Sequence, residues 1–551
     1  MATGCGSVGV VVRQPNPVTP PPPGGFRAGA AETDITPPPG LPVWGSSIEA
    51  SGSVKGYHMR LFTRAIVLED SRGERVALVQ TDLGAVSGLL HRTVASKLSE
   101  YGLGPDRLLI AATHTHGAPG GYFGAAFYNK LAAARRGFDP ELLKWLAERT
   151  VQAVAAAASS LAPARIAAGE LDLSGFTKNR SLDAWKENPG VETSGSDCAS
   201  VDCRVRLLRV DVRKDSEFVP LAAFVVFAAH GTAAGIKQPL YHGDLQAAAA
   251  ELLRHRVPKA YPDASRFIAA FVNGAEGDVS PGWPPWQKQD FARAKTVGSA
   301  LADKAFEIFR TLDGRTTEVS ITHAYREAPV PNAEVPGGQL CDRAIMGVPA
   351  LGGAEDGRSF LYGWLSIKEG SARKPRGCQG TKRTGLGFIQ YLVAQRDDFP
   401  LTLPFQVIRL GDVMTLVSVP GEPTTETGRS IRAATLEAGV KGVVAVVGLA
   451  NEYVGYVATP AEYDVQHYEG ASTLYGRLES LFVRNQIDEL VKSTTGTPIT
   501  GYPLERNYFP GGEKSFWGDK TSCRSGLWKP LDVRKDGGDV FFSWKGLARG
   551  E

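Results

Sequence analysis

The chain has 551 residues, more than a typical single domain, so one large domain with attachments or two domains are expected. Hydrophobic residues make up 43% of the chain and charged residues 22%, as in ordinary globular proteins. The 61 basic and 58 acidic residues leave a net charge of +3, which gives no support for nucleic-acid binding. The apolar run 219–229 is too short to span a bilayer and contains Pro220, so no transmembrane segment is predicted. A peripheral contact with lipid stays open.

The first residues differ from the rest of the chain. Residues 14–25 are rich in proline and predict an extended segment without a core of its own. Thr3-Gly4-Cys5 resembles the end of a bacterial lipoprotein signal, which would make Cys5 a lipid anchor, although a simply disordered start is slightly favoured. We therefore expect a Pro-rich disordered leader over residues 1–25.

The middle of the chain mixes strand and helix patterns. Strands are expected at 26–39, 61–69, 75–82, 108–112, 205–212, 220–229, 266–273, 316–326, 406–410, 413–420 and 443–450. Helices are expected at 86–101, 140–161, 244–257, 288–311, 424–438 and 473–492. The region 326–385 is polar and loop-rich. Because these elements do not alternate as a clean β-α-β repeat, the predicted fold class is α/β, with mixed sheets and surrounding helices.

The cysteines favour an exported protein. Cys198 and Cys203 lie in one polar loop, and Cys341 and Cys378 flank another, so disulfides 198–203 and 341–378 would fit an oxidising compartment. A Cys-rich zinc site is less favoured, because the sequence contains no Cys-x-x-Cys pair. The sequence alone leaves the connectivity open.

The stretch 108–122, Leu-Leu-Ile-Ala-Ala-Thr-His-Thr-His-Gly-Ala-Pro-Gly-Gly-Tyr, is the strongest candidate for a functional site. It begins as a short apolar run typical of a buried strand and delivers His114 and His116 into a glycine-rich turn. Side chains two positions apart on an extended backbone share a face, so both imidazoles are expected in one pocket. Alone, the motif fits equally well one hydrogen-bonded core histidine and one exposed histidine.

Four further loops place reactive side chains where an expected strand ends. Their residues are His230, Ser280, Glu422, and Tyr453 with Tyr456. Each is a weak signal alone, since a histidine after a strand is commonly structural and a glutamate before a helix is commonly a capping charge. Together, two imidazoles and a carboxylate are typical of a zinc site that keeps room for a bound water.

These residues also carry a family resemblance. Thr113–Tyr122 resembles the Thr-His-Thr-His-Ser-Gly-Pro-Gly-Gly-Tyr of the neutral (neutral/alkaline, non-lysosomal) ceramidases. Other similar stretches follow in the family's order: Asn179-Arg-Ser181 with Asn188-Pro189, Gly277-Asp-Val-Ser-Pro281, Pro420-Gly-Glu422 with Thr424-Thr425, and Tyr463–Gly476. The resemblance covers roughly residues 26–500.

The resemblance implies an amidohydrolase that cleaves the N-acyl amide of ceramide into a sphingoid base and a fatty acid. It implies one Zn²⁺ per chain, held by His114, His230, Glu422 and Tyr456. Tyrosine is an unusual ligand, but a divalent cation favours its phenolate. Ser280 matches the residue usually assigned as nucleophile, and His116, Arg180 and Tyr468 would contact the substrate.

Two mechanisms are compatible with these residues. In the first, Ser280 attacks the amide carbonyl and forms an acyl-enzyme. In the second, zinc lowers the pKa of its water, the resulting hydroxide attacks, and His116 with Arg180 stabilises the oxyanion. We favour the second, with Ser280 essential in either case.

The resemblance also implies a large catalytic domain over residues 26–500. The family's C-terminal immunoglobulin-like domain needs about a hundred residues. Residues 501–551 are too few for it, so this domain is expected to be absent, replaced or truncated, and the segment to be an appendage or the start of a small β module. Departures such as Gly117-Ala118 for Ser-Gly and Leu182 for a proline leave the expected ligands intact and bear on substrate identity.

The leading prediction is thus a zinc-dependent ceramidase, secreted or periplasmic, that acts on a ceramide-like lipid and makes at most peripheral membrane contact. The alternatives are a hydrolase of another N-acyl lipid or small amide, and an inactive lipid- or glycan-binding relative. A long apolar groove beside the metal would favour ceramide, whereas a small closed polar pocket would favour another amide.

Overall fold

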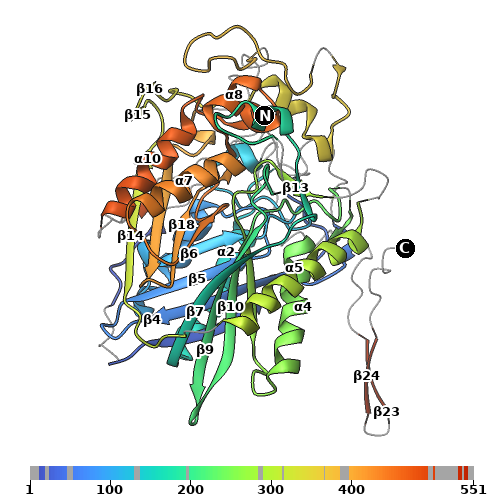
Figure 1. The fold of residues 1–551 in the computed structure, drawn as a ribbon. Coiled ribbons are helices and arrows are strands. Elements are labelled where there is room, and N and C mark those ends of the chain that lie inside the picture. The colour runs from blue at the N-terminus through green and yellow to red at the C-terminus, as the bar shows by residue number, and fades with distance from the viewer. Residues whose placement is uncertain are drawn as a thin grey trace.

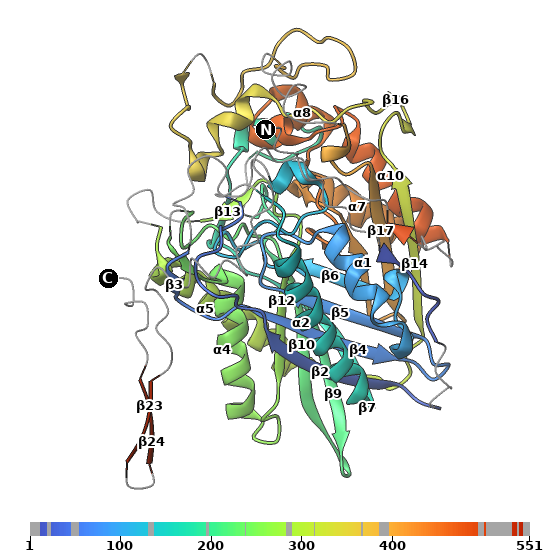
Figure 2. The same ribbon diagram turned by 180° about the vertical axis from the view of Figure 1, so that it is seen from behind.

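A computed structural model describes residues 12–18, 24–45, 54–129, 137–193, 198–236, 238–282, 289–312, 315–364, 367–384, 396–493, 501–502, 532–536 and 539–543. Two stacked sheets with helices on both outer faces form the body of the molecule (Figures 1 and 2). The predicted α/β fold class with mixed sheets is confirmed.

The larger sheet has eight strands in the order β12-β10-β9-β7-β2-β4-β5-β6. In chain order they are β2 (Arg27–Asp34), β4 (Phe62–Glu69), β5 (Arg75–Thr81), β6 (Leu108–Ala112), β7 (Ala162–Asp172), β9 (Arg204–Lys214), β10 (Glu217–Phe227) and β12 (Ile268–Asn273). Strands β5 and β6 are parallel, as are β10 and β12, and the other neighbours run antiparallel.

The smaller sheet has four strands, β14 (Ile321–Pro329), β17 (Thr402–Leu410), β18 (Met414–Ser418) and β20 (Val443–Val447), in that order. Its inner face packs on the larger sheet, because Leu416 and Ala445 share one buried cluster with Ile66 and Leu208. Burial of such aliphatic side chains is the main stabilising term for this arrangement.

Helices cover the two outer faces. Helices α1 (Gly88–Ser96), α2 (Pro140–Ser159), α4 (Asp244–Ala260) and α5 (Phe291–Thr311) lie on the larger sheet. Helices α7 (Thr425–Glu437) and α10 (Glu479–Lys492) lie on the smaller sheet. The result is a four-layer α/β/β/α arrangement, seen from both sides in Figures 1 and 2.

Short elements fill the end of the molecule where the site lies. They are β3 (Gly56–Tyr57), β8 (Thr177–Asn179), β11 (Leu240–Tyr241), β13 (Val279–Pro281), β15 (Glu334–Val335), β16 (Gly338–Gln339), β19 (Glu422–Pro423), β21 (Tyr456–Val457), α3 (Leu182–Lys186), α8 (Pro460–Val465) and α9 (Tyr468–Ser472). The carboxyl ends of β6, β10, β12, β18 and β20 all lead into this end.

Most predicted elements are present with shifted ends. The helix predicted at 473–492 begins at Glu479, and the strand predicted at 316–326 begins at Ile321. Strand β7 is missing from the sequence-based prediction, because its alanines and glycine have low strand propensity and follow an alanine-rich helix directly. Pairing of Ala164–Asp172 with β9 overrides that local preference.

The expected leader and appendage are described only in part. Within the leader, β1 (Val12–Arg13) pairs with β22 (Gly501–Tyr502), and Gln14 Nε2 donates to the carbonyl of Arg92 at 2.8 Å. Near the C-terminus, β23 (Asp532–Asp536) and β24 (Asp539–Ser543) form a hairpin. Cys5 and the other residues of these two segments lie outside the described residues.

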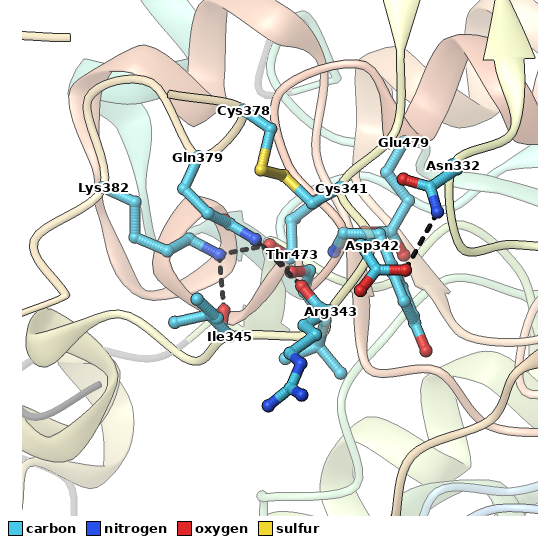
Figure 3. Close-up of a disulfide and its surroundings, with 12 residues drawn as sticks. Asn332, Cys341, Asp342, Arg343, Ile345, Cys378, Gln379, Lys382, Thr473 and Glu479 are labelled. Atoms are coloured by element: carbon cyan, nitrogen blue, oxygen red, sulfur yellow. Dashed lines mark hydrogen bonds between the residues drawn. A yellow bond between two sulfur atoms is a disulfide. The ribbon is translucent and has the colours of Figure 1, made fainter. Parts of the chain in front are cut away.

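Both predicted disulfides are confirmed: Cys198 bonds to Cys203 and Cys341 to Cys378. Beside the second bridge, the buried Lys382 ammonium donates to the carbonyl of Ile345 at 2.8 Å and to that of Thr473 (Figure 3). Burial lowers the pKa of Lys382 to about 7. No described helix has both the length and the apolar composition that crossing a membrane requires.

The buried His91 of α1 makes the folding stability depend on pH. Its Nε2 donates to the carbonyl of Leu108 at 2.9 Å, and burial lowers its pKa to about 3. The unfolded chain therefore binds a proton near pH 6.5 that the folded chain rejects, so folding stability falls as the pH drops from 6.5 towards 3.

Between pH 7 and pH 5, His91→Gln should lose about 2 kcal/mol less stability than the wild type, because it removes this proton linkage. Urea unfolding at the two pH values measures the difference. His255→Gln, at an exposed position of α4, is the matched control and should behave like the wild type. Equal losses in the wild type and His91→Gln would show that His91 can be protonated in the folded protein.

Candidate functional site

The two histidines of the 108–122 stretch lie together, but for a different reason from the one predicted. Strand β6 ends at Ala112, and His114 has a left-handed backbone with φ of 62°. The alternation of an extended strand therefore does not apply to it. The rings of His114 and His116 nevertheless lie 5.0 Å apart and line one pocket. A positive φ is unfavourable for histidine, so the surrounding contacts must hold this turn in place.

Contacts from a second loop hold that turn. Thr115 forms an isolated parallel bridge with Gly231, the residue after His230. A Cβ atom at position 231 would lie 2.2 Å from the carbonyl oxygen of His114, so only glycine allows this approach. The close approach brings the rings of His114 and His230 to 4.6 Å.

Backbone carbonyls fix the protonation of both rings. His114 Nδ1 lies 2.7 Å from the carbonyl oxygen of Gly84, and His230 Nδ1 lies 2.9 Å from that of Glu276. A carbonyl only accepts, so Nδ1 carries the proton in each ring and the Nε2 lone pair is free for a cation. A backbone acceptor on the distal nitrogen is the usual support for a metal-binding histidine.

Glu422 and Tyr456 face these lone pairs from the segments that follow β18 and β20 of the smaller sheet. They are register partners in the parallel pair β19–β21, which places their side chains next to each other. Glu422 Oε2 lies 3.4 Å from His114 Nε2 and 3.1 Å from His230 Nε2, and the Tyr456 hydroxyl lies 3.2 Å from His230 Nε2. Tyr453, which the sequence analysis noted without a role, donates to Glu422 Oε1 at 2.6 Å.

The cluster fits a divalent cation. Nitrogen and oxygen ligands bound at 2.0–2.2 Å with tetrahedral angles lie roughly 3.3–3.6 Å apart, close to the separations of 3.1–3.4 Å found here. His114 Nε2 and Glu422 Oε2 are buried and have no hydrogen-bond partner in the part of the chain that the structure describes, which is costly unless a cation satisfies them. Among the described residues, His116 joins His114 and His230 in a group whose ligand atoms lie within 4.8 Å of one another.

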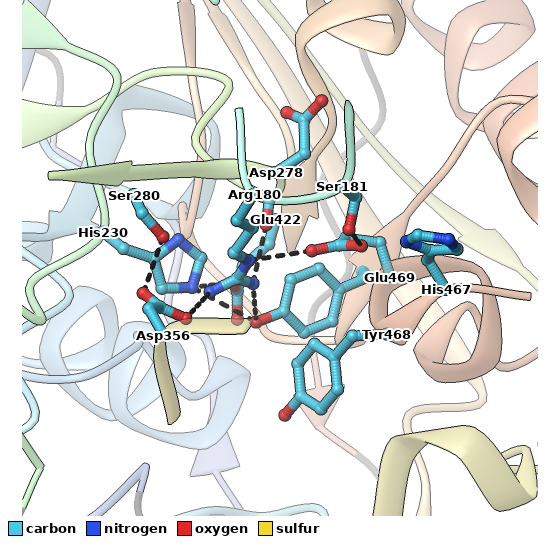
Figure 4. A network of polar contacts seen from close by, with 12 residues as sticks. Arg180, Ser181, His230, Asp278, Ser280, Asp356, Glu422, His467, Tyr468 and Glu469 are labelled. Carbon is cyan, nitrogen blue, oxygen red and sulfur yellow. Dashed lines mark hydrogen bonds and ion pairs between the residues drawn. The ribbon is translucent and has the colours of Figure 1, made fainter. Parts of the chain in front are cut away.

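Arg180 connects this cluster to further carboxylates. Its position follows from the antiparallel pair β8–β13, which lets its N–H donate to the carbonyl of Asp278. Its guanidinium donates to Glu469 Oε1 at 2.8 Å, to the Tyr456 hydroxyl at 3.0 Å and to Asp356 Oδ1 at 3.2 Å (Figure 4). Tyr468 lies under the guanidinium, with its ring centroid 5.5 Å from Cζ.

Ser280 contacts a carboxylate and not a histidine. Its hydroxyl donates to Asp356 Oδ2 at 2.6 Å, as Figure 4 shows. Thr232 donates to the same oxygen at 3.0 Å. Burial opposes ionisation of Asp356, but the Arg180 guanidinium, with His230 and the Ser280 hydroxyl, holds its pKa below the ordinary value. Asp356 is therefore a carboxylate that orients the Ser280 hydroxyl.

Burial and neighbouring charges shift the pKa values of the ionisable groups in the site. Burial, together with neighbouring His114 and His230, lowers the pKa of His116, so this imidazole is neutral. Burial and the nearby Glu422 raise the pKa of Tyr456, so its phenolate needs a cation.

The site and a set of apolar side chains line the same pocket. Trp44, Phe127, Ile236, Leu351 and Leu474 line the walls. His114, His116, Arg180, His230, Glu422, Tyr456 and Tyr468 line the same pocket. Ser280 is buried beside it, in contact with the pocket residue Asp356. The structure thus brings together every site residue predicted from the sequence.

Sequence reasoning misses two residues of the network. Glu469 lies within the stretch Tyr463–Gly476 but was given no role there, and its Oε2 accepts from the Ser181 hydroxyl at 2.5 Å. Asp356 lies in the loop-rich region 326–385, where no strand end or recognised motif marks it. The resemblance of Asn179-Arg-Ser181 could have directed attention to a buried partner for Arg180.

Known proteins resemble this chain in sequence. The family model "Neutral/alkaline non-lysosomal ceramidase, N-terminal" matches residues 26–289 and 282–483. Neutral ceramidase A of Dictyostelium discoideum is 31% identical over 486 residues, which cover 76% of this chain and 66% of that protein. Neutral ceramidase of Mycobacterium tuberculosis is 29% identical over 497 residues, covering 81% of this chain and 73% of that protein.

Two solved structures share the fold. Neutral ceramidase from Pseudomonas aeruginosa superposes with a TM-score of 0.70 at 26% identity, covering 85% of this chain and 74% of that one. A ceramidase complexed with C2 gives a TM-score of 0.72 at 26% identity, with 85% and 75% coverage. The family match covers most of the chain and contains all the site residues described above. The chain belongs to the neutral/alkaline non-lysosomal ceramidase family.

Proposed function

We propose that this protein is a zinc-dependent amidohydrolase that cleaves the N-acyl amide of ceramide into a sphingoid base and a fatty acid. The observation that carries the proposal is the buried cluster of His114, His230, Glu422 and Tyr456 in a pocket that apolar side chains also line. The names of the similar proteins support the same reaction.

The proposed cofactor is one Zn²⁺ held by His114, His230, Glu422 and Tyr456. When bound, it would supply a Lewis acid for the amide carbonyl and lower the pKa of a water. The donor set supports zinc, because two neutral imidazoles with oxygen ligands suit this ion better than calcium or magnesium. The mixture of nitrogen and oxygen ligands is also unlike a structural zinc site.

The chain's own residues would bind the amide and stabilise the charge that develops on its oxygen. Arg180 is fixed by Glu469 and Asp356, so its guanidinium needs no reorganisation during the reaction. His116 is neutral, and neither ring nitrogen has a hydrogen-bond partner among the described residues, so it can orient the substrate's polar groups. Tyr468 lies next to Tyr456, with ring centroids 5.3 Å apart, and would contact the substrate there.

Ser280 would act as an oriented hydroxyl. Its partner Asp356 has a lowered pKa and is therefore a weak base, which makes Asp356 a poor activator of a serine nucleophile. We therefore favour attack by water, with Ser280 donating or accepting a hydrogen bond in the transition state. An acyl group trapped on Ser280 after rapid quenching, detected by mass spectrometry, would overturn this preference.

The walls of the pocket favour a lipid over a small polar amide. Phe127, Ile236 and Leu474 line the pocket and would contact alkyl chains. The two disulfides support export to an oxidising compartment, and Cys5 would be the anchor of a lipidated form. We further propose that residues 26–500 form the catalytic domain, with 501–551 as an appendage.

The reaction is tested first. The purified protein should hydrolyse a fluorescent short-chain ceramide, lose that activity on chelation and regain it when zinc is added back. Release of the fluorescent fatty acid measures turnover. Zinc-loaded protein that hydrolyses another N-acyl lipid but not ceramide would favour the alternative substrate, and protein without metal or hydrolysis would favour an inactive binding relative.

The ligand assignment is tested by metal content. His114→Ala and His230→Ala should lose zinc and lower kcat/KM by at least about a thousandfold, because each removes a ligand that the cluster cannot replace. Ser280→Ala should lose activity but keep its zinc. Elemental analysis beside the kinetic assay separates the two effects. Full zinc occupancy in His114→Ala would exclude His114 as a ligand.

The role of Asp356 is tested by a conservative change. Asp356→Asn should lower kcat by about ten- to a hundredfold with a smaller change in KM, because the Ser280 hydroxyl loses its charged acceptor. Zinc content should stay unchanged. Thr232→Val, which removes the other hydroxyl donor to Asp356, is the control for packing alone and should have a smaller effect. A change confined to KM would indicate substrate binding as the function of Asp356.

A further inference from the structure

Two aromatic side chains stand exposed beside the pocket. Phe360 is 69% exposed and Trp364 is 61% exposed, the highest values for large hydrophobic side chains among the residues that the structure describes. Large hydrophobic side chains are normally buried in the core. Two of them exposed close together in the chain usually mark an interaction surface.

These side chains belong to a segment that also forms the pocket wall. Leu351, Ala354, Asp356 and Ser359 of this segment line the pocket. Its backbone is held by hydrogen bonds from Ser359 N to the carbonyl of Gly352 at 2.8 Å and from the Ser359 hydroxyl to that of Leu351 at 2.6 Å. The exposed aromatics thus project from an ordered turn at the pocket.

The same part of the chain is strongly basic. Residues 358–383 contain seven lysines and arginines but only one acidic residue, Glu369. Arg358, Lys368, Lys374 and Arg376 are exposed. In a chain whose net charge is only +3, this is a pronounced local excess of positive charge.

Covalent and backbone contacts hold residues 368–376, the basic loop, in place. The disulfide between Cys341 and Cys378, drawn in Figure 3, fixes the chain two residues beyond Arg376. Arg373 N and Arg376 N donate to the carbonyls of Thr381 and Gly380. Gly370 N donates to the carbonyl of Gln466 at 3.1 Å. Figure 1 places this loop and the 348–364 segment at the same end of the molecule, opposite the β9–β10 hairpin.

We propose that Phe360, Trp364 and the basic loop 368–376 form a docking surface for a bilayer that contains anionic lipid. Aromatic side chains partition to the level of the headgroups, and lysine and arginine are attracted to anionic headgroups. Because the aromatic and the basic side chains lie beside the pocket, binding through them would bring the pocket to the membrane surface. The inference rests on the proposed function, because a ceramide-like substrate resides in a bilayer.

Binding to vesicles tests the surface directly. The full-length protein should sediment with vesicles of phosphatidylcholine and phosphatidylglycerol, bind phosphatidylcholine vesicles more weakly, and be released by salt. Phe360→Ser/Trp364→Ser and Lys374→Glu/Arg376→Glu should each weaken binding by about tenfold or more. Arg213→Glu/Lys214→Glu, with the same charge change at the exposed tip of the β9–β10 hairpin, should bind like the wild type.

Activity distinguishes this inference from the reaction itself. Both surface variants should keep wild-type kcat/KM on a dispersed short-chain ceramide, which also shows that they are folded. On ceramide embedded in anionic vesicles, their kcat/KM should fall about as much as their binding. Wild-type vesicle binding in both variants would overturn the docking surface. Absence of short-chain hydrolysis in the wild type would instead overturn the proposed function, whatever the vesicle binding.

Discussion

The side-chain amide of Asn273 joins the loops on which the whole site depends. Its Nδ2 donates to the carbonyl of Thr113 at 2.9 Å, and its Oδ1 accepts from the N–H of Ala229 at 3.0 Å. The residues that follow these partners are His114 and His230. A buried amide left unpaired costs about 1–3 kcal/mol, so both bonds favour one arrangement of the two imidazoles. The two edge strands of the larger sheet, β6 and β12, are thereby tied together at the site.

Charge balance is the second constraint. Arg180 is buried with two carboxylates, Glu469 and Asp356, and its guanidinium also reaches Tyr456. Burying ions is costly, and removal of one partner from such a group leaves another charge uncompensated. The network therefore specifies a geometry more than it stabilises the fold. Because Asp356 also holds Ser280, the positions of the guanidinium and the hydroxyl depend on each other.

Much of this arrangement was predictable because strand ends leave a signal in the sequence. Apolar runs followed by polar residues predict where His114, His230 and Glu422 lie, and the resemblance adds Tyr456. The left-handed turn at His114 was not predictable, since it depends on a contact with a distant glycine. Asp356 was also missed, because nothing local marks a loop residue whose partners are far away in the chain. Long-range contacts of this kind are invisible to periodicity.

The segment that carries Asp356 also carries Phe360 and Trp364, which has a thermodynamic consequence. A ligand that binds better to one position of this segment also changes how often the Ser280–Asp356 hydrogen bond is formed. The coupling free energy between binding in the pocket and binding at the aromatic side chains is the same in both directions. Where occupancy of the pocket moves this segment, it changes the affinity for whatever contacts the aromatic side chains, by the same factor as the reverse effect. A rigid segment would set this factor to one.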